Sequence, residues 1–289
     1  MKRFSLYNDE FVAHLTEVRG RTTATGNAYA GDLSRFAAWV EAQGITSFQE
    51  VTTQTVEGYL GKLRTSMTTK ARCRSAISAL FHYLHKQAVV SSNPCNQLES
   101  IKVVTREPEY LSSEQFELLL TAARHTPKFY RGRNIALLNL LFKAGLRRSE
   151  VVGLNVGDID LETGRIKIHR KGGKVQLLPL HSELIISLKN FSYPLERAAH
   201  EPFFTSRLGS RLSGSELYHI VKKYIREAGL SDKLTVHSAR HGFAATTLSQ
   251  GMPITHIQRL LGHANLSTTE RYVHLQNDQV GAALERIRF

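Results

Sequence analysis

The sequence predicts a mainly helical protein of the α+β type, with two domains and a small antiparallel sheet in the second. Apolar residues recur at helical spacing through both halves of the chain, one stretch without periodicity separates them, and one hairpin pattern interrupts the second half. A chain of 289 residues is long enough for two domains. We place these domains at residues 1–104 and 105–289.

Residues 8–90 have the pattern of packed helices. The stretch TGNAYAGDLSRFAAWVEAQG carries an apolar stripe followed by a glycine that ends a helix, and TTKARCRSAISALFHYLHKQAVV carries a second stripe. The residues of the two stripes, with the terminating glycine, are Tyr29, Leu33, Phe36, Val40, Gly44, Ile77, Leu80, Phe81 and Leu84. Both stripes predict helices that bury one face.

The second of these helices begins with a cluster of cations, Lys70, Arg72 and Arg74, and no Asp or Glu occurs between Glu57 and Glu99. A solvated helix face is the simpler explanation of such a run. Helix N-termini normally favour acidic residues, however, so cations at this end indicate an anion nearby. We therefore predict that the three side chains contact phosphates.

Residues 91–110 lack periodicity and contain Pro94 and Pro108, which indicates a connector between the domains. The second domain opens with SSEQFELLLTAARH, which has a Ser-x-x-Gln capping pattern, and continues with the helix RGRNIALLNLLFKAG. GRIKIHRKGGKVQLLPL alternates polar and apolar residues around a Gly-Gly pair, as β-hairpins do. SGSELYHIVKKYIREAGL and three further short helical stretches follow.

The formal charge of +13 and the isoelectric point near 9.9 indicate a polyanionic partner, most often nucleic acid. A membrane is not expected to be the partner, because the most apolar segment, residues 135–142, is too short to span one. Cys73 and Cys95 lie far apart and form no C-x-x-C motif, so we expect neither a disulfide framework nor a zinc ribbon. A reducing cytoplasmic location fits best.

Metal and ATP chemistry are not indicated. His237 and His241 have the spacing of a zinc-binding helix, but no Glu stands between them and Arg240 would repel a dication. The acidic group in GDIDLETGR is explained more simply by a strand and a turn, and no Walker A loop occurs. We expect no metal and no cofactor.

Binding of an anion explains the remaining pattern better. Arg147 follows a helix-ending glycine and has Glu150 three residues on to support it, Lys171 lies at the predicted hairpin tip, and His263 and Tyr272 lie in LLGHANLSTTERYVHL. Each has an ordinary explanation, as a salt-bridge, surface or packing residue. Their combination in this order is harder to explain by packing alone.

These motifs resemble those of the tyrosine recombinase, or phage integrase, family over nearly the whole chain. The similarity is most specific in AGLRRSEVVGL, HRKGGKVQLLPL, VHSARHGFAATTLSQG and PITHIQRLLGHANLSTTERYVHL. The resemblance implies an N-terminal helical core-DNA-binding domain and a C-terminal catalytic domain. The departures are small: Ser238 and Ala239 replace bulkier residues, and Gly242 stands where a larger residue is common.

The resemblance assigns catalytic roles to Arg147, Lys171, His237, Arg240, His263 and Tyr272, with Glu150 as support and Lys174 joining the DNA-binding cations. Two guanidiniums would stabilise the charge that gathers on a phosphodiester under attack, and the histidines would add donors. Tyr272 would be the nucleophile, His237 the base and Lys171 the general acid. The product would be a covalent 3′-phosphotyrosine, formed without metal or ATP.

The tail DQVGAALERIRF forms a short amphipathic pattern. It would pack on its own domain or, as the resemblance implies, be exchanged over residues 278–288 in a homotetramer on double-stranded DNA with inverted-repeat sites. Accessory proteins or a second recombinase are possible partners. The short chain favours a recombinase like the Xer proteins or a transposon or plasmid resolvase; a type IB topoisomerase and a non-catalytic architectural protein or repressor are the alternatives.

Overall fold

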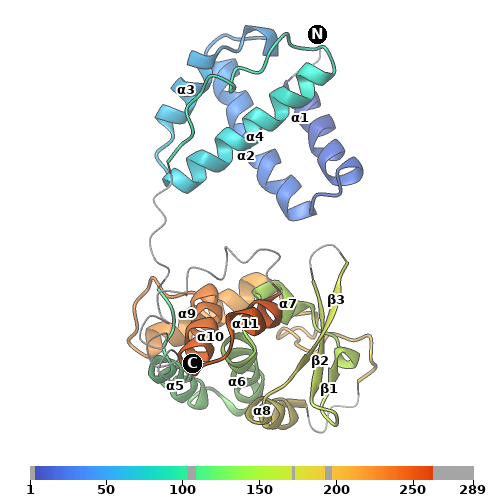
Figure 1. Ribbon diagram of the computed structural model, residues 1–289, viewed down its shortest axis with the longest axis vertical. Coiled ribbons are helices and arrows are strands. Elements are labelled where there is room, and N and C mark those ends of the chain that lie inside the picture. Colours follow the sequence, from blue (N-terminus) through green and yellow to red (C-terminus); the bar gives the residue numbers. More distant parts are fainter. Residues whose placement is uncertain (1–3, 103–108, 171–172, 193–196, 263–289) are drawn as a thin grey trace, which may run out of the picture. The chain divides into compact units, whose positions relative to one another are not determined.

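The computed structural model describes residues 4–102, 109–170, 173–192 and 197–262. Two compact units divide the chain, Met1–Arg106 and Glu107–Phe289 (Figure 1). Each unit has a hydrophobic core of its own. Lys171, His263, Tyr272 and the predicted tail helix at 278–288 lie outside the described residues.

The first unit is helical, and both predicted stripes lie in its core. Thr22, Thr52 and Ser66 cap three of its helices by accepting hydrogen bonds from backbone N–H groups. Leu33, Val40, Ile77, Leu80, Phe81 and Leu84 are fully buried, and Phe36 nearly so. The helices are α1 (Phe4–Ala13), α2 (Thr23–Ala42), α3 (Thr53–Lys62) and α4 (Met67–Lys86), with a π-helical turn at His14–Val18 and a 3₁₀ turn at Phe48–Glu50.

Part of the predicted connector belongs to the first unit instead. Cys95 and Leu98 are buried in its core, and the Asn93 side chain donates a hydrogen bond to the Ser78 carbonyl at 3.0 Å. The segment lacks periodicity because it is not helical, yet single side chains from an irregular segment still fill a core. Helix α1 also begins earlier than expected, at Phe4.

The second unit combines helices with one small sheet, which lies to one side of α6, α10 and α11 (Figure 1). Ser112 and Gln115 form the predicted capping box, and the predicted hairpin pairs its strands in register from Arg165 with Pro179 to His169 with Val175. The sheet is antiparallel in the order β1-β2-β3. Its elements are α5 (Ser113–Arg124), α6 (Lys128–Lys143), α7 (Arg148–Gly153), a 3₁₀ turn (Val156–Asp158), β1 (Ile159–Asp160), β2 (Arg165–His169), β3 (Val175–Pro179), α8 (Ser182–Ser192), α9 (Gly214–Glu227), α10 (Val236–Ser249) and α11 (Ile254–Leu261).

Helix α8 was not among the predicted elements. Leu184 and Leu188 are its fully buried residues, one helical turn apart, and α8 packs against α6. Ile185 and Ile186 directly follow Leu184, so the apolar residues of this stretch do not form one clear helical stripe in the sequence.

Gly242 is a glycine because the backbone of another segment crosses directly over it. A Cβ atom added at Gly242 would lie 2.1 Å from the Leu111 carbonyl oxygen and 2.7 Å from the Phe142 ring. The Leu111 N–H also donates to the Ser238 carbonyl at 3.0 Å, which ties this segment to α10. The departure from the family pattern at Gly242 therefore has a local steric reason.

We predict that Gly242→Ala destabilises the second unit by on the order of 3 kcal/mol, because Leu111 must move away. In an open helix the same change would be stabilising by up to about 1 kcal/mol, so the sign of the effect is diagnostic. Urea unfolding followed by circular dichroism measures the loss. Fluorescence of the chain's one tryptophan, Trp39, reports on the first unit alone and should keep its midpoint.

Gly153→Ala is the matched control, since nothing lies within 4 Å of a Cβ at that position. Equal midpoints for Gly242→Ala and Gly153→Ala would contradict the steric explanation.

Candidate active site

A buried carboxylate, Glu150, lies at the centre of the candidate site. Its Oε2 accepts a hydrogen bond from the Arg147 backbone N–H at 2.7 Å, and its Oε1 accepts one from the Arg147 side chain at 2.8 Å. Arg147 has extended backbone angles and caps the N-terminus of α7, where Glu150 occupies the first turn. The spacing of three residues thus lets the carboxylate reach back and hold the arginine.

Two further arginines reach the same carboxylate from distant parts of the sequence. Arg170, which directly follows β2, donates to Glu150 Oε1 at 2.7 Å. Arg240 on α10 places its Nη1 atom 3.9 Å from Glu150 Oε2. Three cations therefore surround one anion, which leaves the cluster with a net positive charge.

Arg240 is also held by backbone carbonyls. Its Nη1 donates to the Gly145 carbonyl and its Nη2 to the Leu261 carbonyl, both at 2.6 Å. Gly145 has a φ of +60°, and a Cβ there would lie 2.5 Å from the Phe243 ring. The glycine that ends α6 therefore also permits the close approach of α10.

The three arginines differ in exposure. The Arg147 side chain is 36% exposed, whereas those of Arg170 and Arg240 are 7% and 8% exposed. Arg147 is accordingly the member of the cluster that faces solvent most openly.

The charge state of Glu150 follows from its surroundings. Burial raises its pKa, but the hydrogen bonds from Arg147 and the charge of Arg170 outweigh burial, so the pKa lies below its ordinary value. Glu150 is thus ionised at neutral pH and acts as an acceptor for the arginines.

His237 lies in the first turn of α10, and its backbone N–H donates to the Thr235 hydroxyl that caps this helix. Desolvation lowers the pKa of the imidazole, and the charges of Arg148, Arg240 and Arg147 lower it further. The ring is therefore neutral at pH 7 and able to accept a proton.

Two of the three cations at the start of α4, Arg72 and Arg74, have acceptors within the first unit. Arg72 Nη1 lies 2.7 Å from Asp32 Oδ2, and Arg74 donates to the Leu98 carbonyl at 2.7 Å. For Arg72 the nearby anion is thus a buried carboxylate on α2, and for Arg74 the acceptor is a carbonyl of the same unit. Sequence reasoning did not predict these pairings, because each partner lies far along the chain.

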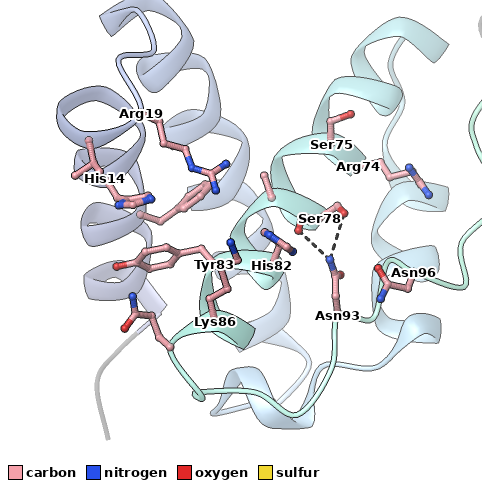
Figure 2. A pocket seen from close by; sticks show the side chains of 14 residues that line it. His14, Arg19, Arg74, Ser75, Ser78, His82, Tyr83, Lys86, Asn93 and Asn96 are labelled. Carbon is pink, nitrogen blue, oxygen red and sulfur yellow. Dashed lines mark hydrogen bonds between the residues drawn. The ribbon is translucent and has the colours of Figure 1, made fainter.

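A basic groove opens beside this run, between the α1–π-helix segment, α4 and the loop after α4 (Figure 2). Its volume is about 620 Å³, and among the residues that the structure places around it none is Asp or Glu. Figure 2 shows His14 and Arg19 on one side of the groove and His82 and Lys86 on α4. The groove is lined by Phe11, His14, Val18, Arg19, Arg74, Ser75, Ser78, Ala79, His82, Tyr83, Lys86, Gln87, Asn93 and Asn96.

No group of three or more His, Cys, Asp or Glu side chains in the described part of the chain is arranged to hold a metal ion. Among the described helices, none combines the length and the apolar character that crossing a membrane requires.

The phage integrase family matches residues 109–279, and the N-terminal SAM-like domain of phage integrases matches residues 9–88. The chain belongs to the phage integrase family. It is a tyrosine site-specific recombinase, an enzyme that cleaves and rejoins DNA strands.

Relatives match over almost the full chain. Tyrosine recombinase XerC of Roseiflexus castenholzii is 32% identical over 281 residues, which cover 93% of this chain and 89% of the relative. Tyrosine recombinase XerD of Vibrio cholerae is 33% identical over 283 residues, covering 94% and 92% of the two chains.

Solved structures share the fold. The post-cleavage complex of XerH bound to a palindromic difH substrate has a TM-score of 0.74 at 25% identity, covering 96% of this chain and 84% of that one. A lambda integrase dimer bound to a COC′ core site has a TM-score of 0.72 at 18% identity, over 94% of this chain and 77% of that one, which shows the fold alone.

Of the predicted site residues, the structure brings Arg147, Glu150 and Arg240 together and places His237 at the start of the same α10. Lys174 is exposed between the strands of the hairpin. Sequence reasoning missed Arg148 and Arg170. Both stand next to residues that the motifs did single out. Arg170 is distinguished by its contacts with Glu150 and α11, and Arg148 by the effect of its charge on the pKa of His237.

We predict that Arg148→Gln raises the pKa of His237, because the variant removes the largest charge that disfavours its protonated form. With His237 as the base expected from the sequence, the cleavage rate should then fall at pH 6 more than at pH 8, since less of the ring remains neutral in acid. Nuclear magnetic resonance titration of the His237 ring measures the pKa directly. Lys189→Gln on α8 removes one exposed positive charge elsewhere and should leave the titration unchanged. An unchanged His237 pKa in Arg148→Gln would show that the charge of Arg148 does not lower the pKa of His237.

Proposed function

We propose that Arg147, Lys171, His237, Arg240, His263 and Tyr272 carry out strand cleavage, with Glu150 supporting Arg147. The observation that carries this proposal is the convergence of Arg147 and Arg240 on Glu150. Two guanidiniums meet there, one from the residue that precedes α7 and one from α10, although the sequence separates them widely. Such a pair matches the geometry and charge of a phosphodiester.

In the proposed reaction, the Tyr272 hydroxyl attacks the phosphorus atom and His237 takes the phenolic proton. The bond from phosphorus to the 5′ oxygen breaks, and Lys171 gives that oxygen its proton. Arg147, Arg240 and His263 stabilise the charge on the non-bridging oxygens. The resulting 3′-phosphotyrosine keeps the bond energy, so a 5′ hydroxyl reverses the step without ATP.

The substrate proposed for the enzyme is double-stranded DNA with inverted-repeat recombination sites. Support comes from the XerH complex, whose description names a palindromic difH substrate. We further propose a homotetramer on DNA that exchanges residues 278–288 between neighbours, with accessory proteins or a second recombinase as additional partners. The enzyme would act in the cytoplasm, where its two free cysteines stay reduced.

Contacts with the DNA backbone are proposed for Lys70, Arg72, Arg74 and Lys174, and for the basic groove of the first unit. Arg19 and Lys86 are the exposed cations that flank the groove. Because no acidic side chain is among the described residues that line the groove, its positive charges reinforce one another and attract phosphates.

Tyr272→Phe is expected to bind a cognate site with unchanged affinity and to form no covalent adduct. The reason is that the ring remains while the nucleophilic oxygen is lost. A nicked suicide duplex traps the adduct of the unaltered enzyme as a species of low mobility in a denaturing gel. An adduct formed by Tyr272→Phe would show that another residue is the nucleophile.

A plasmid carrying paired sites separates recombination from simple relaxation. Deletion or inversion products support the proposed outcome, and relaxation without exchange supports a topoisomerase activity instead.

The double variant Arg19→Gln, Lys86→Gln should weaken DNA binding and reduce the magnitude of the slope of log K against log salt by about 2, close to one unit for each lost phosphate contact. Fluorescence anisotropy over a series of salt concentrations measures this slope. The double variant Arg124→Gln, Lys189→Gln, which removes two exposed positive charges from the second unit, is the control for net charge. A slope that stays unchanged in the double variant would exclude the groove from the DNA interface.

A further inference from the structure

Arg170 connects the end of strand β2 to the end of helix α11. Its Nη2 donates to the Leu260 carbonyl at 2.8 Å and its Nη1 to the Leu261 carbonyl at 3.2 Å. The same Nη1 donates to Glu150 Oε1, while Nε donates to the Gln176 side chain at 3.1 Å on strand β3. One guanidinium therefore joins both strands of the hairpin, the C-terminus of α11 and the central carboxylate.

The charge of Arg170 makes its bonds to the last carbonyls of α11 favourable. The last carbonyls of a helix lack partners within the helix and carry partial negative charge, so a guanidinium at this end satisfies them. Arg170 is 7% exposed, and a buried guanidinium needs such acceptors. A charge-assisted bond of this kind is about twice as strong as a neutral one.

The neighbouring residues support the same connection. Gln176 donates its side-chain N–H to the Arg259 carbonyl at 2.8 Å, which adds a second bond between β3 and α11. Gly262, with φ of +63°, closes α11, and a Cβ there would lie 2.8 Å from Arg170 Cζ. The guanidinium thus fills the space that a side chain at position 262 would occupy.

We propose that Arg170 is a positioning residue for strand cleavage, which fixes the hairpin end to the C-terminal turn of α11 and to Glu150. Lys171 follows Arg170 directly in the sequence, and His263 follows Gly262. The hydrogen bonds of Arg170 thus anchor the chain directly before Lys171 and shortly before His263. This inference rests on the proposed function, in which Lys171 protonates the leaving oxygen.

A substrate with a better leaving group tests this role. When sulfur replaces the bridging 5′ oxygen at the scissile phosphate, the P–S bond breaks and the thiolate departs without needing a proton. A variant that has lost only the placement of its general acid recovers its rate on this substrate. A variant whose site is damaged in general stays slow on both substrates.

The experiment compares single-turnover cleavage of the two substrates by the full-length enzyme and by Arg170→Met, with Lys171→Ala alongside. We expect Arg170→Met to cleave the ordinary substrate about 10²-fold more slowly, in the range of lost general-acid catalysis. On the sulfur substrate it should approach the rate of the unaltered enzyme. Arg165→Met, which removes an exposed arginine from strand β2, should cleave both substrates at the rate of the unaltered enzyme.

The two proposals fail in different ways. If Lys171→Ala recovers on sulfur and Arg170→Met does not, or if Arg170→Met cleaves normally, the positioning role is overturned. If Lys171→Ala does not recover on the sulfur substrate, Lys171 is not the general acid. In that case, recovery by Arg170→Met would show that Arg170 positions a different acid. Failure of Arg170→Met to recover would overturn the positioning role.

Gln176→Ala covers the case in which Arg170→Met does not fold. It removes the bond from β3 to α11 and the acceptor of Arg170 Nε, but it keeps the Arg170 side chain with its bonds to Glu150, Leu260 and Leu261. We therefore expect a smaller rate loss, about tenfold, that sulfur also restores. A loss that sulfur does not restore would overturn the proposal as well.

Discussion

The second unit depends on keeping one carboxylate ionised inside the protein. A buried charge is costly unless cations and hydrogen-bond donors surround it, and Glu150 meets this requirement with Arg147, Arg170 and Arg240. The dependence is mutual, because three guanidiniums would repel one another without the anion between them. The carboxylate holds them together, and in the proposed function the uncompensated positive charge of the cluster attracts a phosphodiester.

The end of helix α11 provides the second organising feature. Carbonyls of Leu260, Leu261 and Gly262 accept bonds from Arg170, Arg240 and Arg147, respectively, in addition to other pairings. These neutral acceptors satisfy N–H groups without cancelling charge, whereas a second carboxylate would have lowered the net positive charge of the cluster. The site therefore gains rigidity and keeps its positive potential.

The features that could be predicted from the sequence are those set by neighbours along the chain. The apolar stripes, the Ser112–Gln115 capping box, the hairpin and the reach of Glu150 back to Arg147 all depend on spacings of a few residues. The roles of Asp32 and Arg170 could not be predicted in this way, because their partners become neighbours only after folding. Cys95 and Leu98 show the same limit in the first unit, where an aperiodic segment completes the core.

The distribution of charge likewise depends on which residues become neighbours after folding. Lys70, Arg72 and Arg74 are conspicuous in the sequence, yet Asp32 offsets the charge of Arg72 and two carbonyls share the guanidinium of Arg74. Arg19, His82 and Lys86 are scattered in the sequence but gather around a groove whose described lining includes no acid. Because a phosphate responds to the summed potential at one place, cations that gather around a groove attract it more strongly than a run in which a carboxylate offsets one of the charges.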